Sequence, residues 1–202
     1  MYEFTVPMAL ADFVPVSLFG ISGVLMQRDL YNKMPKYAFA CFAAGVVNIF
    51  MAGFLKALWK LLYAMGVCDF HVLNTMFLPT QSLGFLLAGL GILIMMGQRK
   101  KVMLAAAPPL FSGTFLFVGM MVLGLGAICG SLAVLAVRMK KKALVPVFFL
   151  CFLCYMSMGY LASRDSASVA MNWIEQGVNT LGQILLLWGV LSLHRAGLRE
   201  LP

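Results

Sequence analysis

The chain has 202 residues, of which 62% are hydrophobic and 11% are charged. Soluble domains carry about a quarter charged residues, so this composition excludes an ordinary soluble domain and indicates a polytopic membrane protein. In a soluble protein, the net charge of +8 would suggest nucleic acid as a partner. Here most of the cations adjoin apolar runs, so membrane orientation accounts for them and no nucleic-acid partner is expected.

Apolar runs follow one another along the whole chain and predict a single all-α transmembrane domain, 1–202. Basic clusters lie between these runs. By the positive-inside rule, these clusters face the cytoplasm, which puts the N-terminus outside and the C-terminus inside. The runs cover 8–27, 37–65, 72–96, 102–118, 120–137, 143–163 and 168–194. The clusters are Arg28, Lys33 and Lys36; Arg99, Lys100 and Lys101; Arg138, Lys140, Lys141 and Lys142; and Arg195 and Arg199.

The region 102–137 decides the number of spans. As one helix, it would put the basic clusters on its two sides on opposite faces of the membrane, against the positive-inside rule. As a tight hairpin, it puts both clusters inside, but each arm has only about 17 residues, or roughly 25 Å of helix. We therefore expect about seven transmembrane helices, with six as the alternative. A small-xxx-small pair in this region, Gly126 and Gly130, predicts close helix packing, within the bundle in preference to a dimer.

Charged side chains inside the apolar runs are the strongest functional signal. Glu175 stands in the last run, where a carboxylate near the middle of a spanning helix costs roughly 2.5 to 3.5 kcal/mol on insertion scales. Counting about 1.5 Å per residue from the middle of each span places Asp12, Lys56 and Glu175 at one depth, outward of the midplane. The predicted ligand-binding residues are Asp12, Lys56, Gln81, Tyr155, Glu175 and Asn179, with Lys60, Asn74, Asn172 and Gln183 as secondary residues.

This polar layer has three interpretations. Asp12 and Glu175 could both pair with Lys56 and clamp three helices together. Lys60, four residues further along the same helix face, could extend its ammonium group to the outer interface, and for Lys60 alone we favour this interpretation. The layer could also line a pocket open to the outside. We favour the pocket, because amides continue the polar stripe of the last span beyond what one ion pair requires.

Recognisable catalytic chemistry is absent from the sequence. It contains no nucleophile elbow, no H-E-x-x-H and no phosphate-cradling glycine loop, so an enzyme is less favoured than a binding protein. Cys151 and Cys154 form a C-x-x-C on one helix face, which we interpret as packed apolar thiols. Cys68, Asp69 and His71 are too few to hold a metal ion on their own. We expect no metal site and no cofactor.

These observations favour a small integral membrane transporter or solute-binding protein whose ligand enters from outside. The alternatives are a receptor or sensor for an external small molecule, an intramembrane lipid-modifying enzyme, and an accessory subunit of a membrane complex. The expected partners are the lipid bilayer and either a polar small molecule or a lipid headgroup, and the sequence leaves a homo-oligomer open. The small size and strong positive-inside bias favour a multi-pass protein of the bacterial cytoplasmic membrane.

Overall fold

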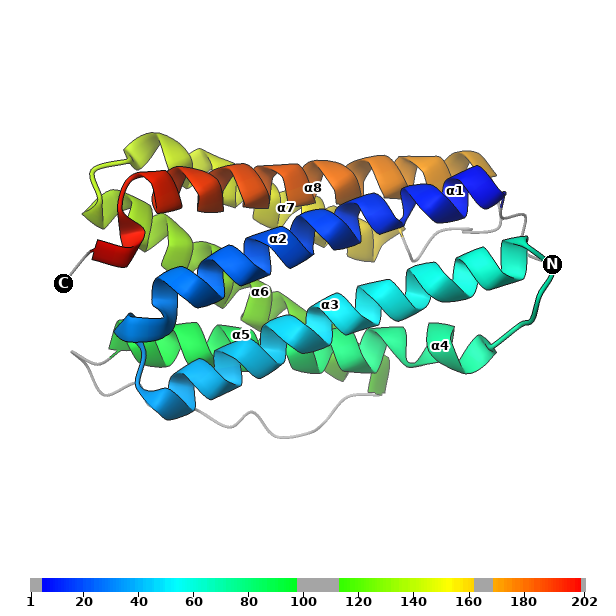
Figure 1. The fold of residues 1–202 in the computed structure, drawn as a ribbon, viewed down its shortest axis with the longest axis horizontal. Coiled ribbons are helices and arrows are strands. Elements are labelled where there is room, and N and C mark those ends of the chain that lie inside the picture. Colours follow the sequence, from blue (N-terminus) through cyan, green and yellow to red (C-terminus); the bar gives the residue numbers. More distant parts are fainter. Residues whose placement is uncertain (1–4, 98–112, 162–168, 201–202) are drawn as a thin grey trace.

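The computed structural model describes residues 5–97, 113–161 and 169–200, and this part of the chain is helical with no strands. Figure 1 shows the long helices running side by side along one axis. The helices are α1 (Val6–Ala11), α2 (Phe13–Leu30), α3 (Lys36–Ala64), α4 (His71–Thr75), α5 (Phe77–Gly97), α6 (Gly113–Arg138), α7 (Val145–Leu161) and α8 (Val169–Arg195). Three short 3₁₀ turns follow α2, precede α7 and follow α8: η1 (Tyr31–Lys33), η2 (Lys142–Leu144) and η3 (Leu198–Glu200).

Five candidate spans in the described residues are long and apolar enough to cross a membrane. α7 is also apolar but shorter, with 17 residues, or about 25 Å of helix. The chain is therefore an all-helical protein with the features of a multi-pass membrane protein, as predicted. The five candidates are Val6–Lys33, Lys36–Ala64, His71–Gly97, Leu116–Arg138 and Val169–Arg195.

Prolines mark where several of these helices begin. Pro7 stands in the first turn of α1, and Pro35 is the N-cap residue of α3. Proline fits these positions because it lacks a backbone N–H, and the first turn of a helix does not use that group. The predicted apolar runs 37–65 and 168–194 agree with α3 and α8 to within a residue at each end.

The predicted division of 102–137 near residue 119 is wrong. α6 continues without a break from Gly113 to Arg138, so residues 113–118 belong to the same helix as 120–137. The remainder of the predicted first arm, 102–112, lies outside the described residues, as does the cluster Arg99, Lys100 and Lys101. The hydropathy of the sequence could not show that the helix is continuous across residue 119, because only glycines and apolar residues stand on either side of it.

The six long helices form a closed ring. α2 packs against α3, α3 against α5, α5 against α6, α6 against α7, α7 against α8, and α8 against α2. Most neighbours in this ring run antiparallel, but α8 runs parallel to α2, since Gln176 meets Ala11 at one end and His194 meets Arg28 at the other, and α5 runs parallel to α6. On α5 and α6, Gly124 approaches Phe85 while Gly89 approaches Ala127, so these two helices run parallel. Both therefore end at the same end of the ring (Figure 1).

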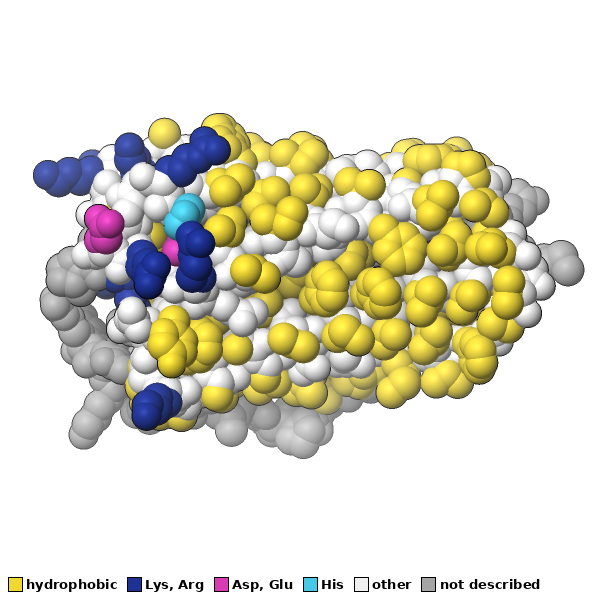
Figure 2. Space-filling view, in the orientation of Figure 1, with side chains coloured by type: hydrophobic (Ala, Val, Ile, Leu, Met, Phe, Trp, Pro, Cys, Tyr) yellow, Lys and Arg dark blue, Asp and Glu magenta, His cyan; other side chains and the backbone are white. Residues whose placement is uncertain are grey.

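That end of the molecule is basic. Figure 2 shows the Lys and Arg side chains gathered there, while hydrophobic side chains cover much of the rest of the visible surface. Arg28 at the end of α2, Arg138 at the end of α6 and Arg195 at the end of α8 all lie at this basic end. We call the opposite end of the ring the outer end.

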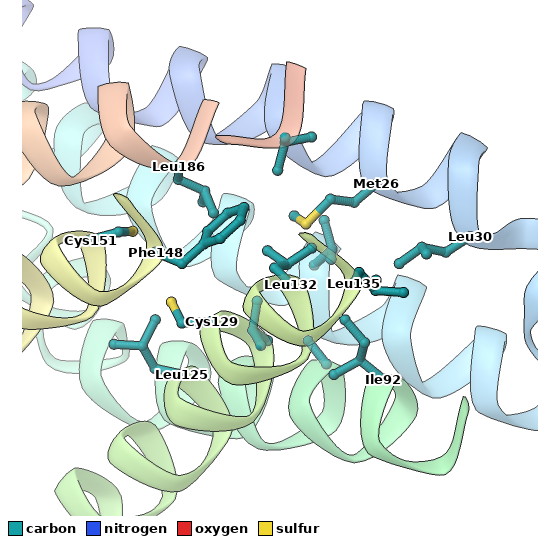
Figure 3. Close-up of a cluster of buried hydrophobic side chains, with 14 of the residues drawn as sticks. Met26, Leu30, Ile92, Leu125, Cys129, Leu132, Leu135, Phe148, Cys151 and Leu186 are labelled. Carbon is teal, nitrogen blue, oxygen red and sulfur yellow. The ribbon is translucent and has the colours of Figure 1, made fainter. Parts of the chain in front are cut away.

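The apolar core occupies the half of the ring next to the basic end. Its α3 members run from Ala38 to Ile49, and its α8 members from Leu186 to Leu193. Figure 3 shows Phe148 and Leu132 meeting Met26 and Leu186 in the centre of this core. Lys56 and Lys60 of α3 and Glu175 of α8 lie beyond the core, towards the outer end. The interior of the ring is thus apolar in the half next to the basic end and more polar in the outer half.

Glycines allow the closest helix contacts in the core, but they are not the predicted ones. A Cβ on Gly45 of α3 would lie 2.3 Å from the backbone nitrogen of Ala88 on α5. A Cβ on Gly124 of α6 would lie 2.2 Å from the carbonyl oxygen of Phe85. At Gly130, by contrast, no atom lies within 4 Å of such a Cβ. The prediction of close packing at Gly126 and Gly130 is therefore wrong, and Gly124 is the close-packing glycine of α6.

Candidate functional site

Asp12 and Lys60 form an ion pair in the outer half of the ring. Lys60 Nζ lies 2.8 Å from Asp12 Oδ2, and the two side chains are only 12% and 13% exposed. The expectation that Lys60 extends to the outer interface is wrong, because its ammonium group turns inward to this carboxylate. The clamp interpretation also named the wrong lysine, since Lys60 rather than Lys56 binds Asp12 directly. The pair holds the first span against α3.

A break in the first span positions Asp12. α1 ends and α2 begins at this residue, three positions before Pro15. Pro15 has no N–H to donate to the carbonyl of Ala11, four residues earlier, so that carbonyl is left without a helical partner. Gln176 of α8 supplies the partner, because its Nε2 donates a hydrogen bond to the oxygen of Ala11. Gln176 is buried but was not among the predicted residues. The position of Pro15 in the sequence indicates that the Ala11 carbonyl lacks a helical partner, and Gln176 binds that carbonyl.

Lys56 and Glu175 are the other two charges of this layer. Lys56 Nζ lies over the ring of Phe77, 4.1 Å from its centroid, in a cation–π contact. Lys56 interacts electrostatically with Lys60, Asp12 and Glu175, so charges from three spans act on one another here. The Oε1 atom of Glu175 is buried and has no hydrogen-bond partner among the described residues. The four charges, defined here as the charged network, are Asp12, Lys56, Lys60 and Glu175.

Three further buried oxygens lie in the ring without a hydrogen-bond partner in the described part of the chain. They belong to Ser82 on α5, Tyr155 on α7 and Gln183 on α8. Each of the three residues is more than 90% buried. Tyr155 meets Phe85 edge to face, with ring centroids 6.0 Å apart, and its hydroxyl approaches the side chain of Gln183. Tyr155 therefore marks the boundary between the apolar core and the polar residues of the outer half.

The other predicted residues are placed as follows. Gln81 on α5 and Asn179 on α8 are half-buried at positions between Tyr155 and the charged network along their helices. Asn172 is buried on α8 and interacts with other residues of the protein. Asn74 lies on the short helix α4 at the outer end. Ser82 and Gln176 are the polar residues of this half that sequence reasoning missed.

Two grooves lie between helices, and the charged network lines neither of them. One, of about 380 Å³, runs between the first span and α8, and Val14, Trp173, Gln176 and Ile184 are among its lining residues. The other, of about 610 Å³, runs between α2 and α3 beside Phe50. Val14, Trp173 and Ile184 are exposed, so the first groove opens to the outside of the bundle rather than to the interior of the ring.

A second polar cluster, not predicted, joins α2 to α8 at the basic end. The Asp29 side chain is fully buried, and His194 Nδ1 lies 2.9 Å from its Oδ2. Arg28 Nη2 lies 2.7 Å from His194 Nε2, and Arg28 Nε is 3.7 Å from Asp29 Oδ1. Depth counting could have found this pair, because both residues stand at the cytoplasmic ends of their predicted spans.

His194 links an exposed side chain to a buried one. Its Nδ1 lies within 3.0 Å of both carboxylate oxygens of Asp29. Its Nε2 lies 2.7 Å from Arg28 Nη2, and its Nδ1 lies 3.3 Å from the same atom. A guanidinium group only donates hydrogen bonds and an ionised carboxylate only accepts them, so the imidazole ring joins the exposed Arg28 to the buried Asp29. This hydrogen-bond chain fastens the first and last spans together.

Cys151 and Asp69 each make a local hydrogen bond. Cys151 is buried, and its Sγ donates to the carbonyl of Gly182 at 3.4 Å. Asp69 accepts a hydrogen bond from Trp59 Nε1 at 2.9 Å, so that carboxylate secures the turn after α3. In the described ranges, no three His, Cys, Asp or Glu side chains converge on a metal position.

Comparison with known protein families, characterised proteins and solved structures finds no match to this chain. Its class therefore rests on the fold and the surface alone: an all-helical membrane protein with a charged network inside its outer half. What that network does has to be argued from its own chemistry.

Proposed function

We propose that this protein is a small multi-pass membrane transporter or solute-binding protein, and that its polar ligand binds inside the outer half of the ring. The ligand is a small polar solute or a lipid headgroup. It contacts Glu175 and Lys56 of the charged network and, deeper in the ring, Tyr155 and Gln183. Gln81 and Asn179 lie between these two levels and complete a polar track along the helices.

One observation carries this proposal: four buried side-chain oxygens from three helices lack a hydrogen-bond partner in the described protein. A buried polar atom without a partner costs about 1–3 kcal/mol, and more where no water can reach it. Native proteins keep few such atoms, and they concentrate at sites that bind something. Here all four are buried within the ring, next to the apolar core that fills the half at the basic end.

The structural-clamp interpretation applies to one half of the network. Asp12 and Lys60 already satisfy each other at 2.8 Å, which is what a clamp between spans requires. Glu175 has no such partner at its Oε1, and Lys56 contacts an aromatic face. We therefore assign Asp12 and Lys60 to structure, and Lys56 and Glu175 to the ligand.

The orientation follows from the basic end. We place this end in the cytoplasm of a bacterial cell, with the N-terminus outside, because the positive-inside rule accounts for its cations. α5 and α6 run parallel, and both end there. The polar track then opens towards the outside, and the apolar core separates it from the cytoplasm.

Equilibrium dialysis tests the proposal. Purified protein in mild detergent is dialysed against a defined mixture of polar metabolites, and both retained solutes and co-purified lipids are identified by mass spectrometry. Solute retention by the wild type supports a solute site, and a stoichiometric phospholipid supports the headgroup. For the ligand retained, we expect Glu175→Gln to weaken binding by at least about tenfold, since it removes a charge-assisted contact.

Tyr155→Phe separates binding from folding. Its hydroxyl approaches Gln183 without a hydrogen bond of good geometry in the described protein, so removing it should change the unfolding temperature little while weakening ligand binding. Ser157→Ala is the matched control on the same helix, because the Ser157 hydroxyl is exposed and donates only to its own helix, to the Leu153 carbonyl. Unchanged binding in both Glu175→Gln and Tyr155→Phe would refute the proposed site. Proteoliposome uptake of the retained solute then distinguishes a transporter from a binding protein.

A further inference from the structure

The charged network is electrically neutral, and only two of its four charges form a direct ion pair among the described residues. It contains two carboxylates and two ammonium groups, and Asp12 with Lys60 forms the one direct ion pair that the described residues show within it. The charges of Lys56 and Glu175 therefore balance each other in sum but are not joined in a direct ion pair. They stand on α3 and α8, two helices that are not neighbours in the ring.

Neither of these two charges takes part in a direct ion pair among the described residues. The Lys56 ammonium is placed over the ring of Phe77, which attracts a cation but is a weaker partner than an anion. Glu175 Oε1 is buried and accepts no hydrogen bond from any described residue. A group that could donate to Glu175, and another that could accept from Lys56, would thus satisfy both.

From this arrangement we infer that the site selects a solute that is neutral overall but carries both a cationic and an anionic group, such as a small amino acid. This inference rests on the proposed function. The cationic end of the solute pairs with Glu175 and the anionic end with Lys56. Two opposite charges enter together, so the neutral network gains two ion pairs and no net charge.

A singly charged solute fits less well for an electrostatic reason. It would add an unbalanced charge to a neutral network inside a membrane protein, where charges are poorly screened. An anion would also meet Glu175, and a cation would meet Lys56, so each would gain one favourable contact and one repulsive one. Discrimination by repulsion of this kind is a general means of specificity.

Serine, ethanolamine and glycerate provide a matched set of probes. Ethanolamine is serine without its carboxylate, and glycerate is serine with a hydroxyl in place of its amine. Binding of each to the full-length protein in mild detergent is measured by equilibrium dialysis at neutral pH. We expect wild-type protein to bind serine at least about tenfold more tightly than either of the others.

Two variants should invert this preference. Lys56→Gln leaves Glu175 unbalanced, so ethanolamine should become the preferred probe. Glu175→Gln leaves Lys56 unbalanced, so glycerate should become the preferred probe. The control is the double variant Asp12→Asn with Lys60→Gln, which removes the closed pair without changing the net charge and should keep the preference for serine.

The outcomes separate this inference from the proposed function. A wild-type preference for ethanolamine or glycerate, or a preference that neither Lys56→Gln nor Glu175→Gln changes, overturns the inference and leaves a polar-solute site intact. Retention of other polar metabolites with no binding of serine, ethanolamine or glycerate also overturns it. If no polar solute of any kind is retained, both the inference and the solute site fail together. Inversion in both single variants, with serine still preferred by the double variant, supports the inference.

Discussion

Replacing His194 with Leu should leave a buried charge without its main partner. The Asp29 side chain is fully buried, and His194 Nδ1 lies within 3.0 Å of both its carboxylate oxygens. Leu cannot donate a hydrogen bond, so the carboxylate would keep only Arg28 Nε, at 3.7 Å, and the more distant charge of Lys33. His194→Leu therefore tests the contact between His194 and Asp29 that joins the first and last spans.

The expected loss can be bounded from these contacts. Removing the hydrogen-bond partner of a buried charged group costs about 1.5–3 kcal/mol, because the charge stays desolvated. Arg28 remains close to Asp29, so we expect a loss of about 2 kcal/mol. His194→Asn should cost less, because its amide N–H₂ stands near the position of Nδ1 and can still donate to Asp29.

The measurement is the free energy of unfolding in mixed micelles, for His194→Leu, Asp29→Leu and the double variant. Because the double variant leaves no buried charge, it should be more stable than His194→Leu alone. The interaction energy between the two positions should be at least about 1 kcal/mol. Additive effects, or a loss in His194→Leu below about 0.5 kcal/mol, would refute the hydrogen-bond chain as a stabilising link.

Three further predictions concern packing and the outer half. Gly45→Val should lower the free energy of unfolding by at least about 2 kcal/mol, because the valine side chain would meet the α5 backbone. Gly130→Val is the control: its side chain would enter open space, and it should change the free energy of unfolding by less than about 1 kcal/mol. Asp12→Asn and Lys60→Met should each destabilise the protein by about 3 kcal/mol, and the double variant should recover most of the loss; full additivity in thermal unfolding would contradict the ion pair. Gln176→Leu should cost about 1–3 kcal/mol because the Ala11 carbonyl loses its donor, and amide exchange around the helix break should quicken.

The span positions could be predicted from the sequence because they depend on length and polarity alone. α3 and α8 agree with their apolar runs to within a residue at each end, since charged or turn-forming residues bound both runs. The depth of the charged residues was also predictable, because rise per residue is fixed in a helix. Asp12, Lys56 and Glu175 accordingly come together.

Rotation of the helices about their axes was much harder to predict. α6 is apolar all around, so no periodic pattern says which glycine faces α5, and Gly124 rather than Gly130 does so. On α8, polar residues occupy neighbouring positions, and one residue turns a side chain by about 100°. The predicted stripe therefore included Glu175 but missed the buried Gln176 beside it.

Depth counting also cannot choose between residues one helical turn apart. Lys56 and Lys60 share a face of α3 and differ in depth by about 6 Å, which is comparable with the error in locating a span centre. The sequence therefore favoured Lys56 as the partner of Asp12, whereas the break at Asp12 directs its carboxylate to Lys60. This displacement by one turn has a functional consequence. It satisfies Asp12 without Lys56, and so leaves Lys56 and Glu175 as the two charges whose partner the proposed ligand supplies.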